Sequence, residues 1–410
     1  MFISGKNKGC GAILQKKYPL ILRFHCQAHV ANLVVKTASE SSDLVKRSIA
    51  VVHELSKLSK DSIKVREVLK AECNDLVYPD SSLSVKALRP LCPTRWLCRF
   101  KPIEATVSNY MALVAGMTKI VEGKMLSTAI ARARAEGILK NLQKPATYLG
   151  LCATLKPLSL LEQLSLTLQA EEMDLDSSDQ AIKTVEEQIS KYRDGDFATS
   201  FQQTIDLVSK NPSMRALTLP RQRLLDTEDI EKHYRVLYLQ FLDKIIMELK
   251  DRFSSGTKSA DLGIYRELCS VFKSGDFPPS LKSYPELDFI KLKIQTTRFR
   301  EITNCTSLHE ARAAYRAMST MERSYYPQVL QLLRILLACP VSASSCERSF
   351  SALRRVKTWL RNSVSQERLN YNIVTTVHRD HLDNINVRES LNVFTSRSDI
   401  RKGMFGINKF

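Results

Sequence analysis

A single glutamate, Glu347, stands among small residues in the stretch CPVSASSCERSF near the C-terminal end of the chain. A carboxylate in such a place could act as a general acid or base, or could bind a metal ion. The spacing also fits a capping box, in which Ser344 and Glu347 each accept a hydrogen bond from an unpaired backbone N–H group at a helix start. The local pattern favours the cap, because capping boxes are common and isolated catalytic glutamates are not.

Cys26 and His29, spaced as Cys-x-x-His, have the chemistry of metal ligands. A tetrahedral zinc site needs four protein ligands, or three and a water molecule. Cys92 and Cys98 could complete such a site, although their C-x5-C spacing is unusual for a zinc finger. The alternative, which the sequence favours, is that Cys26 and His29 are buried at a strand–helix junction and orient each other. We therefore expect no metal site.

The motif Thr94-Arg95-Trp96 follows a proline and could contact a ligand directly. Its structural alternative, which we favour, is a helix N-terminus with a buried indole and a nearby partner for Arg95. The sequence contains no phosphate-binding loop, dinucleotide-binding turn, H-E-x-x-H zinc motif or G-x-S-x-G nucleophile motif. We expect no cofactor and no small-molecule substrate.

Helices are expected to position these residues. The chain has only 13 glycines and 14 prolines among 410 residues, few for an all-β protein with many turns. Strand or turn patterns are limited to residues 18–26 and 81–100, whereas the apolar spacing from about 100 to 335 is nearly all helical. Residues 233–253 form the clearest amphipathic helix.

Three late helices are predicted at 326–338, 344–360 and 366–379, and each carries an apolar stripe. The last of them would start with a second capping box, from Ser363 to Gln366. The stripes comprise Val329, Leu332, Leu333 and Leu336; then Cys346, Phe350, Leu353, Val356 and Leu360; then Leu369, Ile373 and Val377.

Basic residues outnumber acidic ones, 61 against 43, so the formal net charge is +18. An excess of this size suggests a polyanionic partner such as DNA. A generally basic, solvated surface would give the same total, since the charges are spread along the whole chain. The densest run follows Glu347 and supplies the candidate nucleic-acid contacts Arg348, Arg354, Arg355, Lys357 and Arg361.

Ten cysteines are scattered through the chain without a C-x-x-C pair. The stretch MFISGKNKGCGAILQKK lacks the apolar segment of a signal peptide, and no run approaches the roughly 18 apolar residues of a membrane span. These features predict free thiols in a soluble, intracellular protein without a membrane partner.

Three stretches, in this order, resemble the hAT superfamily of DNA transposases and proteins derived from them: FHCQAHVANLVVKTA, CPTRWLCRF and CPVSASSCERSFSALRRVKTWLRNSVSQERLNYNIVTTVHRD. The last is the most specific and looks like the hAT C-terminal dimerisation region. The resemblance implies a fold that is mostly α with a small α/β part: an incomplete RNase H-like core interrupted by a large helical insertion.

The resemblance also implies a domain organisation in four parts. Residues 1–99 would be the partial core, with Cys26, His29, Arg95 and Trp96 as structural family motifs. The helical insertion would follow at 100–319, the dimerisation region at 320–382, and a basic, weakly ordered tail at 383–410.

In hAT transposases the glutamate that matches Glu347 is the third member of an Asp-Asp-Glu triad. A two-metal site needs carboxylates from separate elements to hold two Mg²⁺ ions about 4 Å apart. By the resemblance, both aspartates would lie upstream of Met1. We therefore expect Glu347 to be a vestige that acts as a helix cap, and the chain to be catalytically inactive.

The resulting hypothesis is a transposase-derived, nuclear interaction protein that forms a homodimer, or a heterodimer with a related hAT-type chain, and contacts DNA without sequence preference. One alternative is a truncated form of an active transposase, which would use Mg²⁺. Another is a helical scaffold with a structural zinc. The residues expected at the dimer interface are Phe350, Leu353, Val356, Trp359, Leu360, Leu369, Ile373 and Val377.

Overall fold

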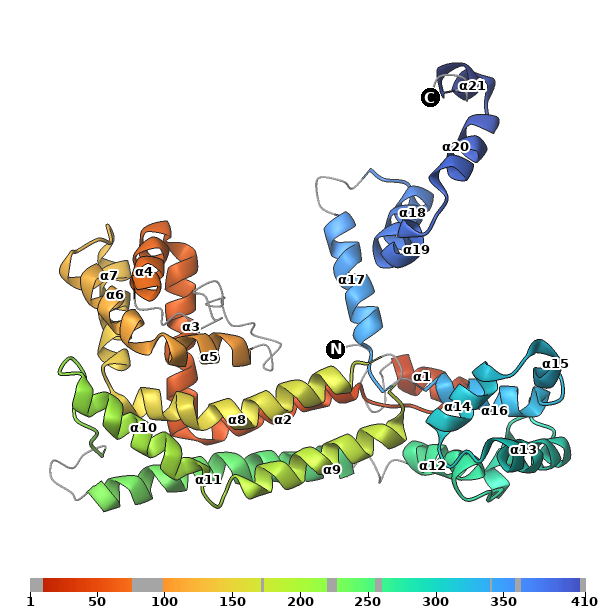
Figure 1. Cartoon of the computed structure of the whole chain (residues 1–410), viewed down its shortest axis with the longest axis horizontal. Helices are drawn as coiled ribbons and strands as arrows, with labels where there is room; N and C mark the ends of the chain where they lie inside the picture. The colour runs from red at the N-terminus through yellow and green to blue at the C-terminus, as the bar shows by residue number, and fades with distance from the viewer. Residues whose placement is uncertain are drawn as a thin grey trace. The chain divides into compact units, whose positions relative to one another are not determined.

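The chain folds into helices and connecting loops, as a computed structural model shows (Figure 1). The chain divides into two compact units, Met1–Ser342 and Ala343–Phe410, and the residues of each unit pack mainly on one another. Every regular element of the described residues is a helix, which confirms the prediction of a mostly α protein. The structure describes residues 10–75, 99–170, 173–219, 227–254, 260–339, 341–357 and 363–405.

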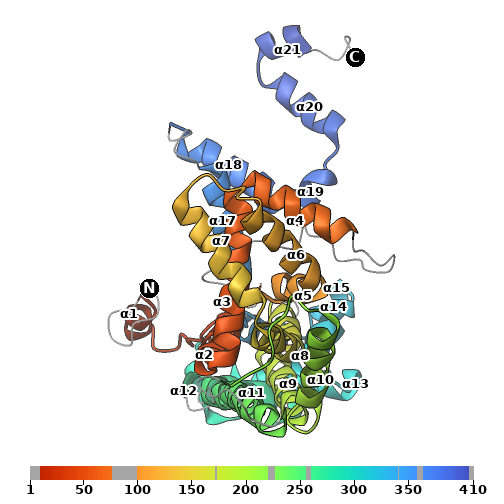
Figure 2. The ribbon, with the colours of Figure 1, turned by 90° about the vertical axis from the view of Figure 1, so that its left-hand side faces the viewer.

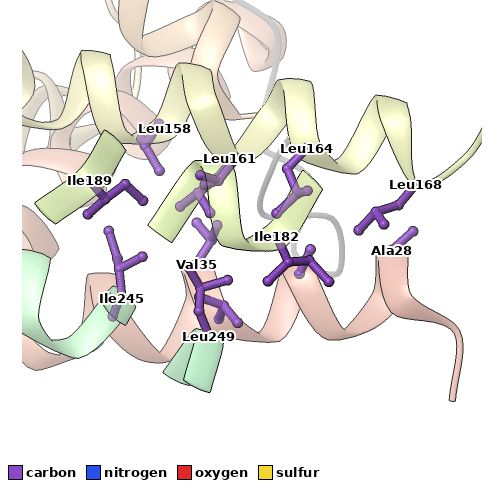
Figure 3. Close-up of a cluster of buried hydrophobic side chains, with 14 of the residues drawn as sticks. Ala28, Val35, Leu158, Leu161, Leu164, Leu168, Ile182, Ile189, Ile245 and Leu249 are labelled. Carbon is purple, nitrogen blue, oxygen red and sulfur yellow. The ribbon is translucent and has the colours of Figure 1, made fainter. Parts of the chain in front are cut away.

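Four long helices form the centre of the first unit: α2 (Gln27–Ser41), α8 (Pro145–Thr167), α9 (Leu175–Lys191) and α11 (Thr227–Leu249). They bury one another because each repeats apolar residues every three or four positions. In α8 and just beyond it, Leu158, Leu161, Leu164 and Leu168 point toward partners on the other three helices (Figure 3). These partners include Ala28 and Val35 of α2, Ile182 and Ile189 of α9, and Ile245 and Leu249 of α11.

A second group of helices packs at one end of this bundle, and Figure 2 views the unit from that end. Helix α3 crosses α8 at Gly150, where a Cβ atom would collide with Ser48 Oγ of α3. Tyr110 of α6 donates a hydrogen bond to the carbonyl oxygen of Leu142, the last residue of α7, at 2.7 Å. The group comprises α3 (Asp43–Asp61), α4 (Ile63–Asp75), α5 (Phe100–Ser108), α6 (Tyr110–Glu122), α7 (Ala129–Leu142) and α10 (Asp196–Lys210).

A third group continues from α11 through the short π-helical turn η3 (Lys250–Ser254). Its centre is the contact of α13 with α16, where the rings of Phe299 and Tyr326 meet edge to face at 5.4 Å. The capping box in this part of the chain is at α15, between Ser319 and Glu322. The group comprises α12 (Ala260–Lys273), η5 (Pro279–Ser283), α13 (Phe289–Thr303), α14 (Leu308–Ala317), α15 (Thr320–Arg323) and α16 (Pro327–Leu337).

The predicted strand at residues 18–26 is wrong. These residues connect α1 (Cys10–Lys17) to α2 without regular structure. A strand needs a neighbour for its backbone hydrogen bonds, and the described residues include no other strand. Instead the backbone N–H of Arg23 donates to Asp261 of α12 at 3.3 Å, and Phe24 meets the ring of Tyr265 edge to face.

The described residues thus contain no strand of the predicted small α/β part, and the RNase H-like core stays a prediction. The second stretch of predicted strand or turn, 81–100, lies almost wholly outside them. The assignment of residues 1–99 to a partial core, and of 100–319 to an insertion, stays a prediction.

The second unit is a chain of short helices: α17 (Ser344–Val356), α18 (Gln366–Val377), α19 (Arg379–Asp383), α20 (Val387–Ser396) and α21 (Asp399–Phe405). Helices α20 and α21 fall in the segment that the sequence predicts to be a weakly ordered tail. The Asn386 side chain caps α20 by accepting hydrogen bonds from the N–H groups of Arg388 and Glu389. The prediction of a weakly ordered tail does not take this capping residue into account. None of the described helices is both long and apolar enough to cross a membrane.

Candidate dimerisation region

Helix α17, which carries Glu347, begins in a different register from the predicted one. Its N-cap residue is Ala343, whose side chain makes no capping hydrogen bond. Ser344 already lies inside the helix, and its hydroxyl accepts a hydrogen bond from the Arg348 guanidinium at 3.5 Å. The predicted Ser344–Glu347 capping box is therefore wrong. Glu347 lies in the first turn, where a negative charge complements the positive end of the helix dipole.

Glu347 is exposed and belongs to no metal-binding cluster of the described residues. Across those residues, no three His, Cys, Asp or Glu side chains come together in a group that could hold a metal ion. Cys26 is half-buried directly before α2, but His29 is exposed, so the predicted burial of both is wrong for His29. Cys92, Cys98, Arg95 and Trp96 lie outside the described residues.

Three buried or half-buried cysteines of the first unit, Cys73, Cys152 and Cys339, are poor nucleophiles. Burial raises the pKa of the Cys73 and Cys339 thiols to about 11 and that of Cys152 to about 12. The thiolate is the reactive form, and at neutral pH these three groups are protonated. They act as small apolar side chains in the core.

Helix α18 begins at Gln366, as predicted, but its cap lies two residues after the predicted one, Ser363. Ser365 is its N-cap residue, and the Ser365 hydroxyl accepts a hydrogen bond from the backbone N–H of Arg368 at 3.4 Å. The predicted box from Ser363 to Gln366 is wrong, because Gln366 is the first residue of the helix. Ser363 and Ser365 both lie just before the helix, and Ser365 is the one that caps it.

Helices α17 and α18 pack on each other and bury very little. Ala352 and Leu369 are the buried apolar residues of this pair among those described. Leu353, Val356 and Ile373 are half-buried. Two short helices with so small a shared core gain little from packing, because hydrophobic stabilisation scales with the apolar area removed from water.

Several large apolar side chains of the same two helices face solvent in a single chain. Phe350 is 69% exposed and Val374 is 56% exposed. Tyr371 and Val377 are also exposed, and the Tyr371 hydroxyl donates to Glu367 Oε1 at 2.8 Å. The stripe predicted to be buried on α17 is thus open at Cys346 and Phe350. Trp359 and Leu360 lie outside the described residues.

The stripe of the preceding helix, α16, is already occupied within the first unit. The four apolar residues of its stripe are at most 3% exposed, and α16 packs against α13. This part of the predicted self-association surface is therefore not available to a second chain. The residues concerned are Val329, Leu332, Leu333 and Leu336.

The basic side chains of α17 are exposed. Arg354 and Arg355 lie in its last turn, where positive charges complement the negative end of the helix dipole. The Arg355 guanidinium donates to Ser351 of the preceding turn at 3.5 Å. Lys357 follows the helix directly, and Arg361 lies outside the described residues.

The model of the hAT family C-terminal dimerisation region matches residues 320–380. The chain carries this region. The hAT region, as we call residues 320–380, contains α15, α16, α17 and α18 and the first two residues of α19. The resemblance seen in the sequence is thereby confirmed, and the region supports dimer formation.

Two curated relatives carry the same name. The chain is 22% identical, over 425 aligned residues, to the Homo sapiens and Mus musculus proteins called "52 kDa repressor of the inhibitor of the protein kinase". The alignments cover 97% of this chain but 54% and 55% of those proteins. The chain thus spans about half the length of the curated relatives it matches.

Proposed function

We propose that this hAT transposase-derived chain is a catalytically inactive interaction protein that forms a dimer through α17 and α18 of the hAT region. The observation that supports this most directly is the pairing of the family match with exposed Phe350, Tyr371 and Val374. Because α16 is already covered within the chain, the interface would lie on the second unit.

A second copy of the chain is the partner that fits this surface. Homo-oligomers with two-fold symmetry place the same patch of both subunits against itself. Phe350 and Tyr371 are aromatic, and aromatic side chains are enriched at the centre of such interfaces. A heterodimer with a related hAT-type chain would use the same surface.

Catalytic inactivity is proposed from the chemistry that a two-metal site requires. Phosphodiester cleavage needs several carboxylates around two cations, whereas α17 offers Glu347 at the family position. The alternative, an active transposase that uses Mg²⁺, is favoured by that same position. By the family resemblance, it would also require two aspartates beside Glu347.

Contact with DNA is proposed as weak and independent of sequence. Arg354, Arg355 and Lys357 are exposed on one unit of a chain with a net charge of +18. Charges of this kind bind phosphates, so the affinity falls steeply as salt rises. A nuclear location is proposed from this chemistry and from the word "repressor" in the names of the two relatives.

The molar mass of the full chain in solution tests the proposed function. Light scattering at micromolar concentration should give twice the 46.5 kDa of one chain. A mass of 46.5 kDa at concentrations up to tens of micromolar would contradict the proposal. The measurement needs no knowledge of any DNA site or partner.

A further inference from the structure

The last two helices, α20 and α21, carry a set of large apolar side chains that no described part of the chain covers. We call these two helices the C-terminal helix pair. They lie outside the hAT region, which ends at residue 380. Val387 is 79% exposed and Ile400 is 73% exposed. The other exposed apolar residues of the pair are Val393, Phe394, Met404 and Phe405.

The pair has internal order but almost no core. The rings of Phe394 and Phe405 meet edge to face with centroids 6.0 Å apart, and the Arg401 guanidinium lies 4.5 Å from the Phe394 ring centroid. Thr395 is its buried residue among those described. Local signals, such as the Asn386 cap, are enough to start α20. Helices this short gain stability mainly from packing an apolar face, and this pair finds no such partner among the residues that the structure describes.

The apolar residues are placed for packing against another surface. Val387, Leu391 and Phe394 follow one another at intervals of four and three residues, so they share one face of α20. Ile400 and Met404 are four residues apart on α21. Exposed apolar side chains gathered in this way mark an interaction site more often than single ones do.

The charge of the pair argues for a protein surface rather than a polyanion. Residues 387–405 contain four basic residues (Arg388, Arg397, Arg401, Lys402) and two acidic ones (Glu389, Asp399), a net charge of +2. The predicted basic tail, residues 383–410, has five basic and three acidic residues, so its basic excess is small. DNA and anionic membranes bind through a larger excess of positive charge than these residues carry.

The position of the pair in the chain identifies the occupant. The hAT region ends seven residues before α20 begins. A second copy held by α17 and α18 would therefore lie close to the helix pair. Binding of the helix pair to that copy would need no second diffusional encounter, because the local concentration of the copy is already high. We propose that the C-terminal helix pair is an additional part of the dimer interface and packs against the second copy of this chain. This inference rests on the proposed dimerisation.

Sedimentation equilibrium of the full chain and its variants tests the inference. One variant ends at Asp383, and two others carry Val387→Asp or Ile400→Asp. Asn392→Asp is the matched control, because Asn392 is exposed on α20 away from the stripe. Val387 is the first residue of α20, where an aspartate is favourable for the helix, so a lost dimer cannot be ascribed to lost helicity.

We expect the truncation and the two stripe variants to raise the dimer dissociation constant by about tenfold or more, the scale of a lost interface anchor. The control should leave the constant unchanged, and far-ultraviolet circular dichroism should show intact helices in all point variants. If the wild type dimerises and the stripe variants and the truncation dimerise equally well, the inference is wrong while the proposed function stands. If the wild type is monomeric, both are wrong.

Discussion

At the scale of single residues, the structure changes the interpretation of Glu347. The sequence offers a carboxylate that could cap a helix, and the family resemblance makes it the remnant of a triad. In the structure it lies in the first turn of α17, with Ala343 as the N-cap residue. The motif identified the helix start to within one residue, but the backbone angles of Ala343, which decide the cap, cannot be read from residue types.

Replacing Glu347 with glutamine should leave DNA cleavage at background. Purified full chain incubated with supercoiled DNA and Mg²⁺ or Mn²⁺ should give no nicking in either form. The substitution removes a charge that complements the helix dipole, so it should lower the stability of α17 by no more than about 1 kcal/mol. Nicking that is present in the wild type and lost in Glu347→Gln would restore the transposase alternative.

The two serines before α18 provide a sharper residue-scale test. Ser365→Ala removes the acceptor of the Arg368 N–H and should destabilise the start of α18 by about 1 kcal/mol. Hydrogen exchange in the first turn of α18 should then become several times faster. Ser363→Ala is the control and should change nothing, whereas equal effects of both variants would favour the capping box predicted from the sequence.

At the scale of elements, long helices were the most predictable part of the fold. The amphipathic pattern at 233–253 corresponds to α11 and η3, and the late helices α16, α17 and α18 lie within the predicted ranges. These predictions succeed because a repeated apolar face demands a helix. The prediction of a strand at residues 18–26 is wrong because a run of apolar residues is equally compatible with a strand and with a loop packed on helices. Helices α20 and α21 were missed because their stripes are short.

At two glycines, substitution by alanine should change the stability of the first unit in opposite directions. Gly150→Ala should destabilise the first unit by about 1–3 kcal/mol, because the new Cβ atom would meet Ser48 Oγ and the carbonyl oxygen of Leu44 across the α3–α8 contact. Gly137→Ala in α7 should stabilise it by up to about 1 kcal/mol, since nothing lies within 4 Å of its Cβ position and alanine is the better helix former. Denaturant unfolding of both variants measures this; a stable Gly150→Ala protein would show that α3 and α8 are not in close contact.

At the scale of the whole molecule, the sequence predicts the kind of candidate interface, which is formed by apolar stripes of the late helices. It identifies only some of the residues that are exposed there. The three late stripes looked equivalent in the sequence. Only the packing of α13 on α16 reveals that the first stripe is occupied, since a stripe does not say what covers it. Phe350, which the sequence predicts at the dimer interface, is exposed rather than buried in one chain. Tyr371 and Val374 join it on the exposed surface of α18.

The central claim is that exposed side chains of α17 and α18 hold two copies of the chain together. Sedimentation equilibrium of the full chain carrying both Phe350→Asp and Val374→Asp tests it most directly. Both residues are exposed in one chain, so a folded monomer should tolerate the aspartates, and each would place a charge in the dimer interface. The control is the double variant Ser351→Asp and Asn372→Asp, which adds the same charge to the same two helices at exposed polar positions.

The account predicts a folded monomer for the first double variant and an unchanged dimer for the control. A dimer that survives Phe350→Asp and Val374→Asp with its dissociation constant unaltered would contradict the account, because the interface would then lie elsewhere.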